Sequence, residues 1–594
     1  MHLRFFVAVV ALGLLAGPRP SVQQPAPGSW WVMAGGRTVV LDEAYNRRGA
    51  VEVGQHALDP VSSPDGRTIA VAAAGAYKPH RTFSGVWEYW PEPGASSSVT
   101  LVKADSLEVL ARPTIRFMPS IVRFTTDGRR LVVVSDGQVS KNAEKQILPA
   151  VTFIDTGDGK VVKEIDLDSE PVRYRWHPDR GLLIAVCAGF DKRAPSLALI
   201  DTAGMSIKQI PLPGRPLGLW PGLKGELDYV NLENEVVPLG PDGVMLAPIS
   251  AGKEKLFVVP LPDLKRLLLS GRSGKDGQLL VIEGGRGTKA IPGPAATNLV
   301  FSSDGTRVVV CGNKMARVMD VASLDEIGRF EIPGTILDVV LDPSDRFLYV
   351  HEGDKVSVVS VADGKQVGRF SVGSGWRKFS TAMSSQGYWV RLGGTVGDAT
   401  GSRSSKATAI DTMAFSPSGK HVFVFNSEAK DISIVDTTTF TSVSKVGVGD
   451  VAQRDFFWRM PGGKHLLALN NNRAIVFDTE AAKVAADRKF DDSVVRIVPS
   501  MAMLLVRTAG GTTMYRASPF EAAFDFGPEC ALGQQALHDN ESGFVADSDT
   551  RRFVLSSAKG VRLYDFDLKL LAEIQGLGLP TKLCFVETPT PDAK

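Results

Sequence analysis

The sequence is poor in cysteine and balanced in charge, and both features narrow what the chain can be. Only 4 of its 594 residues are cysteine, too few for a disulfide-stapled scaffold in a chain of this length. It has no Cys-x-x-Cys-His motif, which excludes covalent attachment of haem by that motif. The 67 basic and 65 acidic residues leave a net charge of +2, so charge gives no reason to expect nucleic-acid binding.

Long apolar runs are missing beyond the N-terminus. There, Arg4 precedes the apolar stretch Phe5–Ala16, and Gly17-Pro18 ends it. An apolar stretch of roughly 7–15 residues is typical of a secretory signal, whereas a membrane span needs about 20. We therefore expect residues 1–20 to be a signal peptide and the mature protein to be periplasmic or extracellular. An uncleaved signal anchor is the alternative, and it would be the only membrane contact.

Motifs of the common catalytic and metal sites are also missing. The sequence has neither His-Glu-x-x-His nor Gly-x-Ser-x-Gly. The segment Gly284–Lys289 lacks the spacing of a phosphate-binding loop, and Asp155–Lys160 lacks that of a calcium loop. The sequence thus predicts no catalytic residue, no metal ligand and no cofactor.

What the chain does contain is a repeated strand-and-turn unit, best seen in Asp411–Gly449. Three short runs rich in Val, Ile and Phe (413–415, 421–425 and 432–435) are separated by polar turns, and a fourth run follows at 442–446. Such residues suit a half-buried strand. Pro417 presets the first turn, and Gly419 can adopt a positive φ.

The same unit recurs along the chain. Aligned turn positions fall at residues 305, 345, 387, 419 and 463, and a repeat of roughly 40–45 residues with four strands is the signature of a β-propeller blade. The repeat weakens between 217 and 293, where we expect two to three blades. A last strand at 582–586 has no partners nearby in the sequence, and we expect it to complete the blade begun at the other end of the chain.

The unit Phe415–Thr437 resembles the YVTN/YncE-type repeat, a WD40-like blade of secreted bacterial proteins. No copy carries a Trp-Asp pair at the third strand. The resemblance implies an all-β propeller and leaves the function open, because one fold hosts many activities. Relatives of this architecture include lactonases and quinone- or haem-dependent oxidoreductases.

The expected organisation is two tandem rings of about seven four-stranded blades. A single ring typically takes 4–8 blades, and the chain has room for about 13–14 units of 40–45 residues. We expect a linker at 21–29, a first propeller at 30–295, a second at 296–587 and a disordered tail at 588–594.

Aspartates recur at the ends of the third strands. They are Asp155, Asp201, Asp320, Asp436, Asp478 and Asp565. A ring of carboxylates binding cations is one interpretation. Because the residue repeats in blade after blade, we favour a turn-capping role instead. Cys187, Cys311 and Cys584 lie in expected strands and are interpreted as buried apolar residues; whether these three and Cys530 form disulfides stays open.

Two insertions carry the candidate binding residues. The first, Ala76–Ser98, interrupts a blade and is rich in aromatic and charged side chains, as is typical of a partner-binding loop; the second is Gly373–Thr408, part of which matches a turn and a second strand of a blade. For the first insertion, the alternative is a loop that folds over the ring and buries its own aromatic residues. For the second, the alternative is that the aromatic residues belong to the core of a blade. The candidates are His80, Arg81, Phe83, Trp87, Tyr89, Trp90, Trp376 and Arg377.

The sequence favours a binding or scaffold protein whose partner is another protein or a component of the cell envelope. The alternative is a propeller enzyme of lactonase or oxidoreductase type, with its site at the central channel. Convergent His, Asp, Glu and Arg side chains at one channel mouth would favour that alternative.

Overall fold

A computed structural model of the chain supplies the fold. It describes these residues: 28–81, 87–92, 96–137, 147–189, 193–220, 227–233, 235–250, 256–261, 266–271, 278–292, 298–312, 314–334, 336, 338–352, 355–371, 389–392, 395–398, 413–426, 430–448, 457–459, 464–470, 473–490, 494–498, 503–508, 511–516, 521–530, 543–547, 550–577 and 580–587. The segments expected as signal peptide and C-terminal tail lie outside these ranges.

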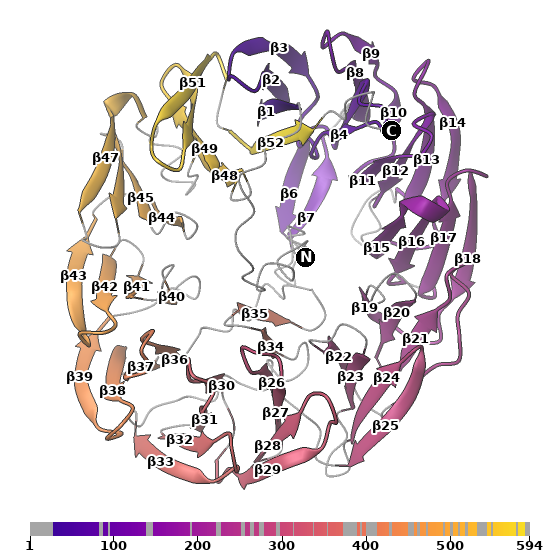
Figure 1. Cartoon of the computed structure of the whole chain (residues 1–594). Helices are drawn as coiled ribbons and strands as arrows, with labels where there is room; N and C mark the ends of the chain where they lie inside the picture. Colours follow the sequence, from indigo (N-terminus) through magenta and orange to yellow (C-terminus); the bar gives the residue numbers. More distant parts are fainter. Residues whose placement is uncertain are drawn as a thin grey trace.

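The described residues form twelve larger sheets and one two-stranded sheet. Figure 1 shows the twelve sheets arranged radially around one ring, as the blades of a β-propeller, with the first strand of each blade innermost. The predicted fold class, an all-β propeller, is confirmed.

We number the blades in chain order, with strands from the inside outward. Blade 1 comprises β52 (Lys582–Glu587), β1 (Gly28–Ala34), β2 (Arg37–Leu41) and β3 (Arg47–Glu52), and blade 2 comprises β4 (Val61–Ser62), β5 (Thr68–Ala73), β8 (Ser97–Lys103), β9 (Val109–Ala111) and β10 (Thr114–Ile115). Blade 3 comprises β11 (Pro119–Phe124), β12 (Arg130–Ser135), β13 (Ala150–Asp155) and β14 (Val161–Asp166), and blade 4 comprises β15 (Pro171–His177), β16 (Leu182–Cys187), β17 (Ser196–Asp201) and β18 (Ser206–Pro211).

Blade 5 comprises β19 (Pro216–Trp220), β20 (Asp228–Leu232) and β21 (Val236–Leu239), and blade 6 comprises β22 (Leu256–Pro260), β23 (Arg266–Gly271), β24 (Gln278–Glu283) and β25 (Arg286–Pro292). Blade 7 comprises β26 (Asn298–Phe301), β27 (Arg307–Gly312), β28 (Met315–Asp320) and β29 (Glu326–Glu331), and blade 8 comprises β30 (Asp338–Leu341), β31 (Phe347–Glu352), β32 (Lys355–Ser360) and β33 (Gln366–Ser371).

Blade 9 comprises β36 (Met413–Phe415), β37 (His421–Asn426), β38 (Asp431–Asp436) and β39 (Ser442–Gly447), and blade 10 comprises β40 (Phe457–Arg459), β41 (His465–Asn470), β42 (Arg473–Asp478) and β43 (Lys483–Lys489). Blade 11 comprises β44 (Val494–Val498), β45 (Met503–Thr508), β46 (Gly511–Arg516) and β47 (Ala522–Gly527), and blade 12 comprises β48 (Phe544–Asp547), β49 (Arg552–Ser557), β50 (Gly560–Asp565) and β51 (Leu570–Gln575). Two 3-10 turns, η1 (Pro178–Arg180) and η5 (Pro528–Cys530), join strands.

Burial within a blade follows the position of the strand. The second and third strands of blade 3 are buried at nearly every position, whereas the outermost strand β29 of blade 7 alternates between exposed and half-buried residues. Middle strands are covered by a neighbouring blade on both faces, so they consist of continuous apolar residues. The outer strands carry charges on an unpaired edge, which discourages pairing with other chains.

Twelve apolar clusters, one between each pair of neighbouring blades, hold the ring together. One joins Leu268 of blade 6 to Phe301 of blade 7, across the boundary between residues 295 and 296 at which two rings were expected to meet. Another joins Val554 of blade 12 to Trp30 of blade 1. The expectation of two tandem rings of about seven blades is therefore not confirmed; the described clusters form one closed circuit of twelve blades.

The ring closes as expected. β52, the last strand, is the inner strand of blade 1 and pairs antiparallel with β1 from Gly28↔Glu587 to Met33↔Lys582. The rings of Trp30 and Phe585 lie 4.9 Å apart across this pair. Closure by the two chain ends ties blade 12 to blade 1 without leaving a free inner edge at the seam.

The expected blade around residue 387 is wrong. β34 (Trp389–Leu392) pairs parallel with β26, the inner strand of blade 7, and antiparallel with β35 (Thr395–Asp398). These two strands extend an existing blade toward the middle of the ring (Figure 1). The weak region from 217 to 293 forms two blades, the lower of the two numbers expected. The described residues form twelve blades in all, fewer than the 13–14 units expected.

The turns confirm the structural interpretation of the recurring aspartates. Asp436 Oδ1 accepts the backbone N–H groups of Thr438 and Thr439, both at 2.8 Å. The same caps form at Asp155, Asp201, Asp320, Asp478 and Asp565. The bonds to the Thr438 and Thr439 backbone contribute to a pKa of Asp436 below its usual value. These carboxylates fold the turns.

The interpretation of Cys187 and Cys311 as buried residues is confirmed, and the open question of disulfides is answered. Cys187, Cys311 and Cys530 are buried and Cys584 is partly buried, and all four are free thiols. Burial raises the pKa of Cys187 and of Cys311 to about 12. A thiol of this kind stays protonated and behaves as a small apolar residue.

Candidate functional site

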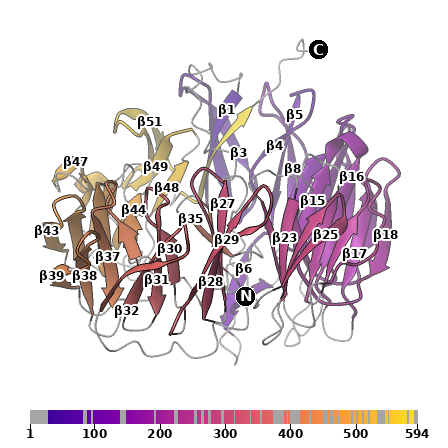
Figure 2. The ribbon, with the colours of Figure 1, turned by 60° about the horizontal axis from the view of Figure 1, so that its bottom comes forward.

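Strand direction places two sets of connections on one face of the ring. Strands alternate in direction within each blade, so the connection between the second and third strands leaves from the same side as the connection to the next blade. We call this side the loop face. It is opposite the side on which β52 ends, because β52 is a first strand (Figure 2).

The first predicted binding element forms a hairpin on the loop face. β6 (Tyr77–Arg81) pairs antiparallel with β7 (Trp87–Pro91) and with no other described strand. The hairpin leaves blade 2 between β5 and β8 and is directed toward the middle of the ring (Figures 1 and 2). In blade 1 the same connection needs only Gly35 and Gly36 between strands.

The base of this hairpin is fixed to the ring. Glu92 N donates to Ala76 O at 3.1 Å, and Ser97 Oγ donates to Ala74 O at 2.8 Å. Gly75 has a φ of 77°, and a Cβ there would lie 2.6 Å from the carbonyl oxygen of Ser96. The His56 ring, from the connection between blades 1 and 2, stacks on Tyr77 with centroids 3.8 Å apart. Burial lowers the pKa of His56, which favours the neutral ring in this stack.

The backbone register brings most of the predicted residues of this insertion together. His80 pairs with Glu88, Arg81 with Trp87, and Tyr89 and Trp90 follow on β7. Phe83 lies between the two strands, outside the described residues, as do Trp376 and Arg377 of the second insertion. Side-chain positions on β6 and β7 from residue 78 to 91 are also outside the description, so the partner-binding role of these residues stays a prediction.

Sequence reasoning missed a cleft of about 440 Å³ between blades 3 and 4 on the loop face. Its walls come from the end of β14, the connection after it, the approach to β17, and the end of β18. The residues that line it are Leu148, Asp166, Leu167, Asp168, Arg193, Ala194, Pro195, Ser196, Gln209 and Pro211. Its volume falls within the range of roughly 300–1,000 Å³ found for small-ligand sites.

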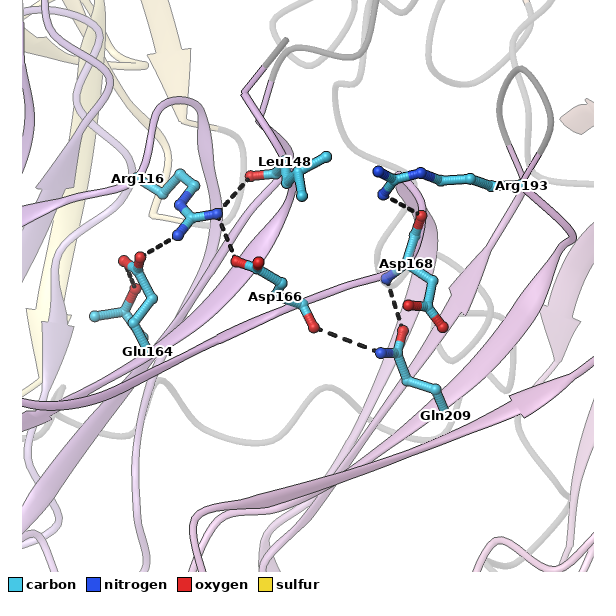
Figure 3. Close-up of polar contacts among 8 residues, drawn as sticks. Arg116, Leu148, Glu164, Asp166, Asp168, Arg193 and Gln209 are labelled. Carbon is cyan, nitrogen blue, oxygen red and sulfur yellow. Dashed lines mark hydrogen bonds and ion pairs between the residues drawn. The ribbon is translucent and has the colours of Figure 1, made fainter.

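An ion-pair network closes one side of this cleft (Figure 3). Arg116, from the connection between blades 2 and 3, donates to Asp166 Oδ1 at 2.7 Å, to Leu148 O at 3.3 Å and also to Glu164. Thr152 Oγ1 donates to Glu164 at 3.2 Å. Arg116 is therefore engaged by two carboxylates and ties the outer strand β14 of blade 3 to the connection from blade 2.

The opposite side is held by an amide. Gln209 of β18 accepts the N–H of Asp168 at 2.8 Å and donates to Asp166 O at 3.5 Å. Arg193 Nη1 donates to the carbonyl oxygen of Asp168 at 2.8 Å, not to its carboxylate. The backbone along this wall is thus already hydrogen-bonded, while two side-chain charges, Arg193 and Asp168, line the cleft without an ion pair to any described residue (Figure 3).

Two further polar clusters link neighbouring blades. Arg507 is fully buried and donates to Thr512 Oγ1, Ser556 Oγ and the carbonyl oxygen of Cys530. Burial lowers its pKa to about 10. The His177 and Asp228 side chains meet at 2.5 Å across blades 4 and 5. Within the described ranges, no group of three or more His, Cys, Asp or Glu residues is placed to hold a metal ion.

Comparison with known proteins identifies no family for this chain. No known family and no curated protein matches the sequence. Among solved structures, the chain is similar to the dihydro-heme d1 dehydrogenase NirN in complex with DHE, at 14% identity and a TM-score of 0.29, covering 60% of this chain and 76% of that one. It is similar to apo AztD from Citrobacter koseri, at 14% identity and a TM-score of 0.29, covering 59% and 92%. A eukaryotic initiation factor shares 10% identity at a TM-score of 0.32, covering 79% and 96%.

These similarities are too distant to say anything about activity. The resemblance to the YVTN/YncE repeat stays a prediction, since no family match supports it. In the described part of the chain, no helix has the length and apolar character required to cross a bilayer.

Proposed function

We propose that this protein is a secreted or periplasmic binding protein that recruits a protein or cell-envelope partner through the hairpin β6–β7. The observation that carries the proposal is the hairpin itself, a two-stranded sheet outside every blade, anchored at its base by Tyr77, Gly75 and Ser97. A propeller does not need this element, because blade 1 closes the same connection with two glycines.

The hairpin supports binding for a physical reason. A two-stranded sheet is marginally stable by itself in water. Each strand of this sheet has one edge that pairs with no described strand, and such edges accept an extended strand of a partner. Aromatic residues are enriched at the centres of protein interfaces, and the sequence of β7 is Trp-Glu-Tyr-Trp-Pro.

Site-specific photo-crosslinking in the native host tests the proposal. A photoreactive residue replaces Tyr89 in β7, and the matched control replaces Val443, which is 52% exposed on the outer strand of blade 9. We expect a discrete crosslinked species from position 89 and none from position 443. Identical crosslinking from both positions would contradict the proposal.

A hairpin-deletion variant provides the second readout. Residues 77–91 are replaced by two glycines, as in blade 1, which leaves β5 and β8 paired. The variant should keep the thermal stability of the ring and lose the crosslinked partner in pull-down. Fractionation and mass of the mature N-terminus test export: a periplasmic or secreted protein shortened by about 20 residues is expected, and a full-length cytosolic protein would contradict it.

A further inference from the structure

The cleft between blades 3 and 4 combines two unpaired charges of opposite sign. The Asp168 carboxylate and the Arg193 guanidinium both line it, and neither forms an ion pair with a described residue. In Figure 3 the Arg193 guanidinium lies over the main chain of Asp168, while the Asp168 carboxylate points away from it, toward Gln209. A ligand that carries both an ammonium and a carboxylate group would satisfy both residues.

The other charges around the cleft are already used. Asp166 and Glu164 are engaged by Arg116. This network fixes the wall and leaves Asp168 as the acceptor available to a cation.

An extended peptide strand is a poor fit to this wall. The N–H of Asp168 and the carbonyl oxygen of Asp166 are both hydrogen-bonded to the Gln209 amide, so the backbone offers little to a pairing strand. Recognition must come from side chains, at the charged ends of a ligand. The apolar surfaces of Leu148, Pro195 and Pro211 can cover a small body between those ends.

We propose that this cleft binds a small zwitterion of dipeptide size, with its ammonium group on Asp168 and its carboxylate on Arg193. This site is separate from the hairpin and does not depend on the partner proposed above. The cleft volume of about 440 Å³ accommodates such a ligand. The neighbouring ion pairs and the Gln209 amide fix both walls before the ligand arrives, which reduces the entropic cost of binding.

Calorimetric titration of the full mature chain with Ala-Ala tests the proposal, together with its N-acetyl and C-terminal amide derivatives. Ala-Ala should bind saturably, and Asp168→Asn should weaken its binding about tenfold, the loss of one charged hydrogen bond. Asp168→Asn should leave the weaker binding of N-acetyl-Ala-Ala unchanged, because that ligand has no ammonium group. Arg193→Gln should likewise weaken the binding of Ala-Ala about tenfold. It should leave the binding of the C-terminal amide of Ala-Ala unchanged, because that ligand has no carboxylate group.

The control is Asp179→Asn, an equivalent change in η1, where the side chain is 72% exposed and lies on the face opposite the cleft. It should bind Ala-Ala like the unaltered protein. No saturable binding of Ala-Ala would overturn the proposal. The proposal would also be overturned if Asp168→Asn lost the same affinity for N-acetyl-Ala-Ala as for Ala-Ala. It would be overturned too if Asp179→Asn lost as much affinity for Ala-Ala as Asp168→Asn does.

Discussion

Leu324 occupies a position where glycine should be better tolerated than alanine. It lies in the turn between the third and fourth strands of blade 7 with a φ of 58°, and its N–H donates to Asp320 O at 2.8 Å. Gly159 and Gly364 occupy the equivalent position in blades 3 and 8, with φ of 69° and 70°. Yet Leu324 is only 3% exposed, because its side chain packs into the cluster between blades 6 and 7.

Two effects of known size therefore compete at this position. Truncating a buried leucine costs about 2–5 kcal/mol, and both Leu324→Ala and Leu324→Gly incur this cost. A left-handed φ costs a non-glycine residue roughly 1–2 kcal/mol, and only the glycine variant is relieved of it. We expect Leu324→Gly to be about 1 kcal/mol more stable than Leu324→Ala, although both are less stable than the unaltered protein.

Hydrogen exchange read by mass spectrometry measures this local stability, in peptides from β23 to β28 for the Leu324 variants and in peptides from β27 to β32 for the control. The control is Leu348, which is fully buried in β31. At this position the order of stability should reverse, and Leu348→Gly should be about 0.5–1 kcal/mol less stable than Leu348→Ala. If Leu324→Gly exchanges faster than Leu324→Ala, as at Leu348, the explanation of this turn is wrong.

Two further predictions concern backbone space and buried charge. Gly364→Ala should lower the melting temperature more than Gly419→Ala. Both glycines have φ near 70°, but a Cβ at 364 would lie 2.8 Å from the Arg329 backbone nitrogen, whereas a Cβ at 419 would have no neighbour closer than 3.5 Å. Equal decreases in melting temperature would refute this prediction. Burial raises the pKa of Asp431 despite the opposing charge of Lys445. Since the folded state then holds the proton more tightly, stability falls as pH rises from about 4. The melting-temperature advantage of Asp431→Asn should therefore grow between pH 4 and 7, and an advantage independent of pH would contradict it.

The local features of the blades could be predicted from sequence because each depends on neighbouring residues. Gly419 and Asp436 mark turns whose geometry is set within four or five positions. The closing role of β52 followed from a strand left without partners. The leucine in the left-handed turn at 324 was missed, although its place four residues after a capping aspartate, where blade 3 has Gly159, was a usable signal.

The features that were missed depend on contacts between blades. The number of blades in a ring depends on the angle between neighbouring blades. That angle is set by the packing of the apolar clusters between them, such as the cluster that joins Leu268 to Phe301, and the repeat pattern carries no information on it. The cleft assembles Leu148, Asp168, Arg193 and Gln209 from four separate segments. None of them belongs to a motif, so no spacing in the sequence could bring them together.

In the described part of the chain, twelve blades form one closed ring, and the hairpin of blade 2 extends from this ring toward the middle. Cryo-electron microscopy of the mature protein tests it most directly, through class averages viewed along the ring axis. We expect a single ring of twelve radial sheets, with blades 6 and 7 in contact and blade 12 beside blade 1. Two smaller rings, each closed on itself and divided near residue 295, would contradict it.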